Sequence, residues 1–207
     1  LFTKVYSCEM KGNQILVEGS LAGIARTPVV KFGLVFEFFK DGVVKMTLNG
    51  KLKKNIPEKI LYLPRIGFEF KSPVLDEGFE YFAYGDAENY VDMHCHTKMG
   101  LFRSKASAEY VNYPMPQEHG NHYNAKYLKM DNGLSFAAET SFEFNVSEYT
   151  SNELDLKRHA HELVKSEFTN IRVDYINSGI GSASCGPDLS EKYRFDRGEF
   201  EFTFYMN

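Results

Sequence analysis

The chain has 207 residues, of which 43% are hydrophobic and 25% are charged, and its formal net charge is -4. This composition is typical of a globular protein with enough apolar residues to form a core. Binding to nucleic acid needs an excess of Lys and Arg to neutralise phosphates, and the chain has no such excess. No apolar run approaches the ~20 residues of a membrane-spanning helix, so we expect neither nucleic acid nor a membrane as a partner.

Strand signals dominate the first half of the chain. Residues 43–52 (VVKMTLNGKL) alternate apolar and polar side chains with a period of two, which is typical of a half-buried strand. The preceding LVFEFFKDG ends in Asp41-Gly42, a hairpin turn signal. Further alternating runs lie at 66–70 (IGFEF) and 79–85 (FEYFAYG).

Three more alternating runs follow in the second half, at 126–130, 134–139 and 141–146. The tripeptide Asp131-Asn132-Gly133 predicts a turn between the first two of them. The final stretch, EFEFTFYM, places Phe and Met side chains on one face of a last strand. Because it ends one residue before Asn207, we expect this to be the natural end of the protein.

The sequence predicts a single short helix near residues 151–165. Thr150 and Glu153 have the spacing of a capping box, in which the two side chains satisfy free backbone N–H groups at a helix start. Leu154, Leu156, Ala160, Leu163 and Val164 then give an approximate apolar stripe. Without a linker or an internal repeat, residues 1–207 are predicted to form one all-β domain.

Cysteine usage indicates the redox compartment. Cys8, Cys95 and Cys185 are odd in number and lack a metal-binding spacing, so we predict free thiols in a reducing compartment. The chain begins LFTKVY, without Met or a signal-like segment, which suggests a piece of a longer polypeptide. We expect it to lie in the cytoplasm, with the periplasm as the alternative.

Histidines near residue 94 are candidate metal ligands. If the segment is extended, Asp92, His94 and His96 share one side, and His119 and His122 follow downstream. Imidazole and carboxylate groups suit zinc. However, H-x-H is a short motif, and strands commonly carry surface histidines, so we predict no metal site in this chain.

Carboxylates and thiols give no complete catalytic set either. Asp86 and Glu88, with Glu80 nearby, could supply an acid and a base, but nothing fixes the ~5–5.5 Å separation that a retaining glycosidase needs. The loop NSGIGSASCGPDLSEKYRF contains Cys185 beside Ser182 and Ser184. No neighbouring imidazole or helix start would lower the pKa of that thiol, so we do not expect a nucleophile there.

Several segments in order resemble family 2 β-galactosidases. They are YGDAENYVDM (84–93), GLF (100–102), PQEHGNHYNAKYL (116–128), FEFNVSEYTSNEL (142–154) and GIGSASCGPDLSEKYRF (179–195), preceded by LPRIGFEF (63–70). They match the C-terminal domain of the family, which some bacteria encode as a separate small chain. The resemblance is clear from about residue 60 onward and weaker before that.

The resemblance implies an antiparallel β supersandwich, also seen in galactose mutarotases, of which this chain would be the C-terminal portion. It implies an enzyme that hydrolyses terminal β-D-galactosides such as lactose with retention. The catalytic glutamates, and the Mg²⁺ and Na⁺ of familiar members, belong mainly to a preceding barrel domain that is absent here. No catalytic residue or cofactor is therefore assigned to this chain. Its expected partners are the rest of the enzyme or a large subunit, a galactoside and further copies in a homo-oligomer.

The resemblance also gives the loop a role. In the best-known members this loop presents a Trp to the incoming sugar, and aligning Ser184-Cys185-Gly186-Pro187 with it puts Cys185 at the Trp position. A thiol lacks the stacking face of an indole. Two interpretations stay open: Cys185, with Ser184 and Gly186 beside it, lines the aglycone side of the pocket, or it merely packs the loop.

Two other functions remain as alternatives. One is an autonomous aldose epimerase or carbohydrate-binding module, in which His122 with Glu80 or Glu118 would be the acid and base. The other is a plain β-sandwich interaction module. The absence of Trp argues mildly against a lectin-like module, because such modules usually stack an aromatic ring on the sugar.

Overall fold

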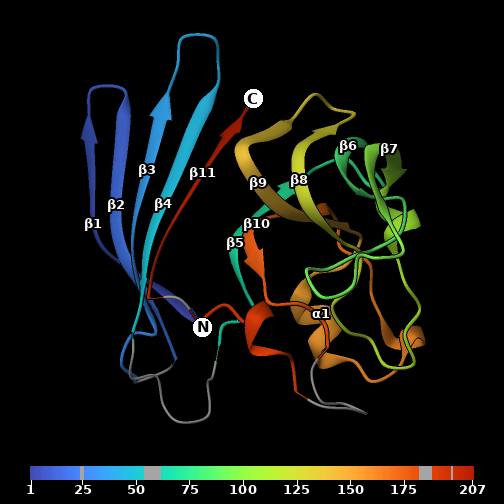
Figure 1. Ribbon diagram of the computed structural model, residues 1–207. Coiled ribbons are helices and arrows are strands. Elements are labelled where there is room, and N and C mark those ends of the chain that lie inside the picture. The colour runs from blue at the N-terminus through green and yellow to red at the C-terminus, as the bar shows by residue number, and fades with distance from the viewer. Residues whose placement is uncertain (24–25, 54–61, 182–187, 197) are drawn as a thin grey trace. The chain divides into compact units, whose positions relative to one another are not determined.

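The computed structural model describes residues 1–23, 26–53, 62–181, 188–196 and 198–207. The chain divides into two compact units (Figure 1). Unit 1 contains Leu1–Leu63, Phe136–Glu139 and Phe195–Asn207, and unit 2 contains Pro64–Ser135 and Thr140–Arg194. That both units belong to one supersandwich domain stays a prediction.

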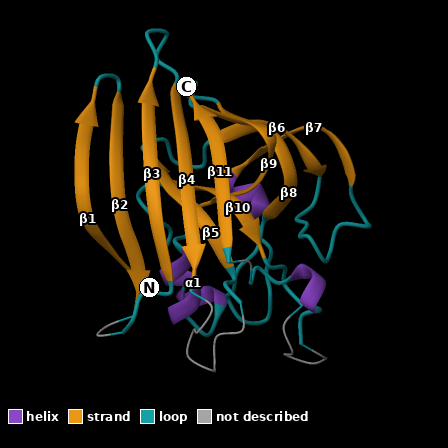
Figure 2. Ribbon diagram, turned by 60° about the vertical axis from the view of Figure 1, so that its left-hand side comes forward, coloured by secondary structure: helices purple, strands orange, loops and turns teal. Residues whose placement is uncertain are grey.

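Unit 1 is an antiparallel sheet in the order β1-β2-β3-β4-β11, whose strands run side by side in Figure 2. β11 also pairs with the start of β9, at Phe136 and Ala137. The strands are β1 (Phe2–Lys11), β2 (Gln14–Ala22), β3 (Val30–Phe38), β4 (Val44–Leu52) and β11 (Glu199–Met206). The first two strands carry no clean alternation that sequence inspection could detect.

Period-two patterning creates the core of unit 1. On β4 the apolar members of the alternating run, Met46 and Leu48, are buried, and on β11 Phe202 and Phe204 lie opposite them in register. The hairpin before β4 forms as predicted, since Gly42 has φ +93° and the Asp41 side chain accepts the Val43 N–H at 3.2 Å. The strand predictions for 43–52 and for the C-terminal run are confirmed.

The strands of unit 2 are connected through one set of pairings. β6 (Gly78–Gly85) pairs with both β7 (Lys98–Lys105) and β8 (Asn121–Met130), and β8 is hydrogen-bonded in turn to β9 (Ser135–Ser147), whose residues 136–139 belong to unit 1. β10 (Thr169–Asn177) lies between β9 and β5 (Arg65–Ser72). The predicted runs at 134–139 and 141–146 form one continuous strand, β9, which is largely accessible up to Ser141 and buried from Phe142 to Ser147. The turn at Asp131-Asn132-Gly133 is confirmed, with Gly133 at φ +101°.

β10 carries polar residues into the interior. The run from Thr169 to Asp174 is buried on both faces, because β10 is central between two strands. Ile171 and Val173 join the apolar core, so the alternate residues, Asn170, Arg172 and Asp174, are buried as well. Buried polar groups require partners, and these partners organise the site described below.

The predicted helix is present but shorter than 151–165. α1 spans Ser151–Leu156 and ends where Lys157 becomes extended, and a short 3-10 turn at Ala160–Glu162 follows. Thr150 caps the helix as predicted, accepting the Glu153 N–H at 3.1 Å. The Glu153 carboxylate instead accepts the Val164 N–H at 2.9 Å.

The apolar stripe of the helix region is only partly realised. Leu154 is buried, whereas Leu156 and Val164 are exposed. None of the described helices has the length and apolar character of a membrane span. With strands dominant, all described pairs antiparallel and one short α-helix, the prediction of an antiparallel all-β fold is confirmed.

Candidate functional site

The described part of the glycine-rich loop is anchored by Asp92. Its carboxylate accepts the backbone N–H of Ile180 at 3.2 Å and that of Gly181 at 2.9 Å. Gly179 has φ +85°, and a Cβ there would lie 2.3 Å from Asp92 Oδ1. Glycine is therefore required at position 179 both for its backbone conformation and for the close approach of the carboxylate.

A buried carboxylate, that of Glu143, holds the end of β10 from which the glycine-rich loop starts. Glu143, on β9, accepts the Asn177 backbone N–H at 3.0 Å and the Asn121 side-chain amide at 2.7 Å. The Asn177 side chain in turn accepts the Gly179 N–H at 3.0 Å. The end of β10 and the start of the loop are thus fixed by a continuous set of hydrogen bonds.

The environment of Glu143 favours the protonated form. Glu143 is buried, and burial raises the pKa of its carboxyl from 4.5 to about 8, although the N–H donors of Asn177 and Asn121 oppose this shift. Burial likewise raises the pKa of Asp174, against the attraction of Arg65. The interior of unit 2 therefore holds carboxyl groups that are costly to ionise.

This predicts a pH-dependent stability. Between about pH 4.5 and 8 the unfolded Glu143 carboxyl has lost its proton while the folded one retains it, so the unfolding free energy should fall as pH rises through this window. Asp174 contributes with the same sign. Urea denaturation of the wild type and of Glu143→Gln at several pH values would measure the slope. We expect a shallower fall in the variant, and equal slopes would contradict the assignment.

Arg65 joins two carboxylates beside this network. Its guanidinium pairs with Asp174 and, at 2.8 Å, with Glu118. The Asp174 side chain is only 4% exposed. Arg65 stands at the start of β5 and Asp174 on β10, so the ion pair joins residues far apart in the sequence.

The histidines weighed as metal ligands are bound to other groups. His94 Nδ1 lies 3.0 Å from the Tyr90 carbonyl, and the ring packs against Tyr84 and Tyr123 at centroid distances of 5.2 and 5.1 Å. His96 Nε2 lies 3.0 Å from the Glu88 carbonyl. Within the described ranges, no three His, Cys, Asp or Glu side chains gather as a metal site would require.

Comparison with known proteins identifies the family. The family model described as β-galactosidase small chain matches residues 4–206. The chain belongs to this family.

Curated β-galactosidases match it over most of its length. The protein of Actinobacillus pleuropneumoniae is 35% identical over 207 residues, covering 98% of this chain, and that of Kluyveromyces lactis is 32% identical over 197 residues, covering 90%. That of Staphylococcus xylosus is 30% identical over 183 residues, covering 86%. These matches cover 20%, 19% and 18% of the relatives, so the chain spans about a fifth of their length.

One of the segments that resemble β-galactosidases has a structural role in unit 2. In YGDAENYVDM, Asn89 is buried, donates to the carbonyls of Tyr84 and Ala87 at 2.9 Å, and accepts the Tyr123 N–H at 2.7 Å. The same motif supplies Asp92. The family match begins at residue 4, so the relationship extends into the region where individual motifs resemble the family weakly.

The residues expected nearest the substrate, Ser184, Cys185 and Gly186, lie outside the described residues, as does Ser182. Their role therefore stays a prediction. Cys8 and Cys95 are free and exposed, in agreement with the free thiols predicted for them.

Asp86 and Glu88, the candidate acid and base, line a cavity of about 580 Å³ in unit 2. Glu109, His96 and Tyr113 also line it. Glu88 already binds the Tyr113 hydroxyl and, at 2.8 Å, the Gly120 N–H. Asp86 also borders the cavity, whereas Glu80 is not among its lining residues. This arrangement gives Glu88 a structural role.

The epimerase hypothesis named His122 with Glu80 or Glu118. His122 is fully buried on β8 and its Nε2 lies 2.8 Å from a Glu109 oxygen, while Glu118 pairs with Arg65. His122 therefore has a different carboxylate partner from either one proposed, and it does not face an open cleft.

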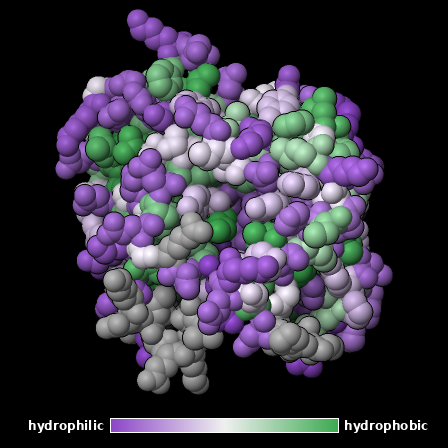
Figure 3. Space-filling model, in the orientation of Figure 1, coloured by the Kyte–Doolittle hydropathy of each residue, from purple (hydrophilic) through white to green (hydrophobic). Residues whose placement is uncertain are grey.

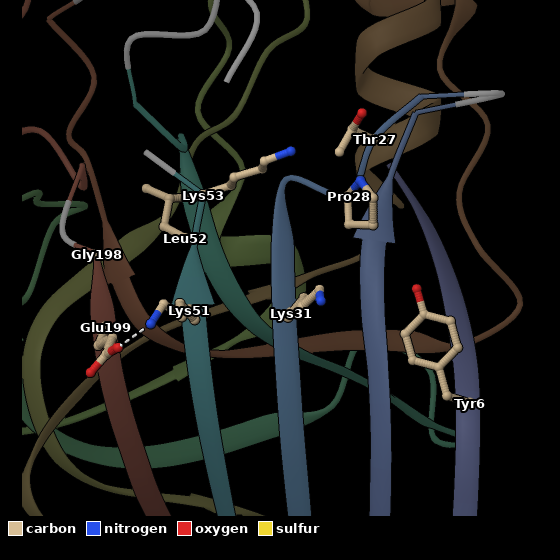
Figure 4. A pocket seen from close by; sticks show the side chains of 9 residues that line it. All are labelled: Tyr6, Thr27, Pro28, Lys31, Lys51, Leu52, Lys53, Gly198 and Glu199. Atoms are coloured by element: carbon tan, nitrogen blue, oxygen red, sulfur yellow. Dashed lines mark hydrogen bonds and ion pairs between the residues drawn. The ribbon is translucent and has the colours of Figure 1, made fainter. Parts of the chain in front are cut away.

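A larger cavity, of about 1010 Å³, lies on the unit 1 sheet (Figure 4). It is bordered by Lys31, Lys51 and Lys53, and the Tyr6 ring lies at the end opposite Glu199. Glu199 is the carboxylate among its lining residues and pairs with Lys51 at 2.6 Å. A single ion-paired carboxylate does not provide the two groups that glycoside hydrolysis requires.

Sequence inspection missed the roles of Glu143, Arg65 and Asp174. For Glu143 and Asp174 the signal was a carboxylate between apolar residues, as in FEF (142–144) and VDY (173–175). Such a residue is unusual at a buried position and needs a partner.

Proposed function

We propose that the chain is the non-catalytic C-terminal part of a β-galactosidase that hydrolyses terminal β-D-galactosides, such as lactose, with retention. The observation that carries the proposal is a family match from residue 4 to 206 combined with coverage of only a fifth of the relatives. The two catalytic glutamates, and any Mg²⁺ or Na⁺, would belong to the remainder of the enzyme. This chain would complete the active-site rim and subunit contacts of a cytoplasmic homo-oligomer.

The anchored loop supports the contribution to the rim. Asp92 and Asn177 hold Gly179 and Gly181 through backbone amides, so the loop leaves the sheet in a fixed direction. A rigid base lets the residues beyond it contribute to substrate positioning. We propose that Cys185, with Ser184 and Gly186, lies on the aglycone side of the pocket.

The isolated chain is expected to be inactive. Supplied alone with o-nitrophenyl galactoside, it should release no nitrophenol above background, because no complete acid–base pair is assigned to it. The complete enzyme is the positive control under the same conditions. Hydrolysis, or accelerated galactose mutarotation, by the isolated chain would overturn the proposal.

Substitution of Cys185 in the complete enzyme tests the loop. We expect Cys185→Trp to lower KM for lactose, since an indole adds a stacking face, and Cys185→Ala to change it less. Steady-state kinetics with lactose would measure both variants. Unchanged KM and kcat in both would leave Cys185 with a packing role alone.

A further inference from the structure

One edge of the unit 1 sheet is open. Among the described residues β1 pairs only with β2, so its other side presents a row of backbone N–H and C=O groups. The register shifts between Val5 and Ser7 but is regular from Ser7 to Lys11. A long exposed edge is a template for pairing with another strand, and proteins normally cover or interrupt such edges.

The apolar face of this sheet is covered at one end only. On β4 and β11 it is buried, at Met46, Leu48, Phe202 and Phe204. On β2 and β3 the same face is half-buried, at Ile15, Val17, Phe32, Leu34 and Phe36. On β1 it is exposed, and its members are Val5 (54% exposed), Cys8 and Met10 (80% exposed).

This gradient leaves apolar side chains of β1 uncovered. On the side where β1 and β2 lie, a few hydrophobic side chains reach the surface among mostly hydrophilic ones (Figure 3). Lys4 pairs with Ser20 and Lys11 pairs with Gln14, so these lysine side chains lie on the opposite face of the sheet. They therefore do not shield the apolar face. A strand edge that is regular from Ser7 to Lys11 and continuous with an uncovered apolar face is typical of a surface that is covered in the assembled protein.

We propose that this surface, defined by β1 and the apolar faces of β2 and β3, docks the part of the β-galactosidase that the chain does not span. The occupant would add a strand to β1 and place apolar side chains over Val5, Cys8 and Met10. Size favours this occupant, because the chain spans about a fifth of its relatives, and the other four-fifths of such a protein is available to cover the surface. The inference rests on the proposed assembly with the rest of the enzyme.

The exposed thiols of Cys8 and Cys95 provide an internal comparison. In the complete enzyme, alkylation by iodoacetamide, followed by peptide mass spectrometry, should modify Cys8 at least about tenfold more slowly than Cys95, because a covered thiol reacts only after local opening. In the isolated chain both thiols should react at similar rates. Rapid modification of Cys8 in the complete enzyme would overturn the proposal.

Two matched variants localise the effect to one face of β1. Met10→Lys should raise the Cys8 modification rate in the complete enzyme about tenfold or more, because the assembly would bury an unpaired ammonium group. Ser7→Lys places the same group on the opposite face, across from Glu18, and should leave the rate unchanged. Equal effects of the two variants would overturn the assignment of the face.

Other outcomes separate this inference from the proposed function. If Cys8 becomes reactive when the complete enzyme is dissociated into single copies, the surface binds a second copy, and the proposal is wrong. Galactoside hydrolysis is measured on the same samples. An active enzyme with unprotected Cys8 would refute the docking alone, whereas protected Cys8 without hydrolysis would support the docking and refute the proposed function.

Discussion

Replacing Arg65 by methionine is expected to lower the unfolding free energy by about 3–5 kcal/mol, as is typical when one partner of a buried ion pair is removed. Arg65 is the shared counter-charge of Glu118, whose side chain is 32% exposed, and of Asp174, whose side chain is 4% exposed, so its removal takes this counter-charge from a buried carboxylate. Urea denaturation of the chain, with the slope compared between variants, would measure the loss.

A matched exposed pair provides the control for this experiment. Lys51 and Glu199 also form a cross-strand ion pair, but both side chains are largely exposed, so Lys51→Met should change stability little. Adding Asp174→Asn to Arg65→Met should recover part of the loss by removing one of the uncompensated carboxylates. Equal effects of Arg65→Met and Lys51→Met would show that the Arg65 cluster has no special importance.

Gly179→Ala is expected to impair the complete enzyme more than any other single change at the loop base. Alanine at φ +85° costs about 1–3 kcal/mol in backbone strain. Its methyl group would also displace the Asp92 carboxylate, which holds the loop. Since a misplacement of about 1 Å can cost about 100-fold in rate, kcat/KM for lactose should fall by up to that factor.

Gly133→Ala is the control that separates the effect of backbone strain from the effect of displacing the Asp92 carboxylate. Gly133 also has a positive φ, +101°, but a Cβ there would meet nothing within 4 Å. The Gly133→Ala variant should therefore lose unfolding free energy as Gly179→Ala does, but its hydrolysis of lactose should be unchanged. Asp92→Asn, which keeps the shape of the side chain, should give an intermediate loss of activity. If Gly179→Ala hydrolyses lactose as the wild type does, the anchored loop base has no role in substrate positioning.

The sequence predicted those strands whose two faces differ in environment. The alternation at 43–52 and in the C-terminal run was visible because one face of each strand is buried and the other polar. β10 was missed for the opposite reason: its central position buries both faces, and polar side chains on one of them obscure the pattern. α1 was predicted from its cap, whereas its end at Leu156 depends on tertiary contacts that local residues do not reveal.

The candidate site was less accessible to sequence reasoning than the fold. The glycines of the loop signalled an unusual backbone, but their partner, Asp92, is nearly ninety residues away and was weighed as a metal ligand instead. Likewise, Arg65 and Asp174 are 109 positions apart. Contacts of this kind form only when segments that are distant along the chain become neighbours in the fold. They cannot be predicted from composition or from the spacing of residues in the sequence.

The contact between Asp92 and the loop has an evolutionary consequence. The Asp92 carboxylate binds main-chain N–H groups, which every residue except proline has. Apart from the glycines that it contacts, the carboxylate therefore does not restrict which side chains the loop carries. Residues at the tip can therefore diversify without loosening the attachment.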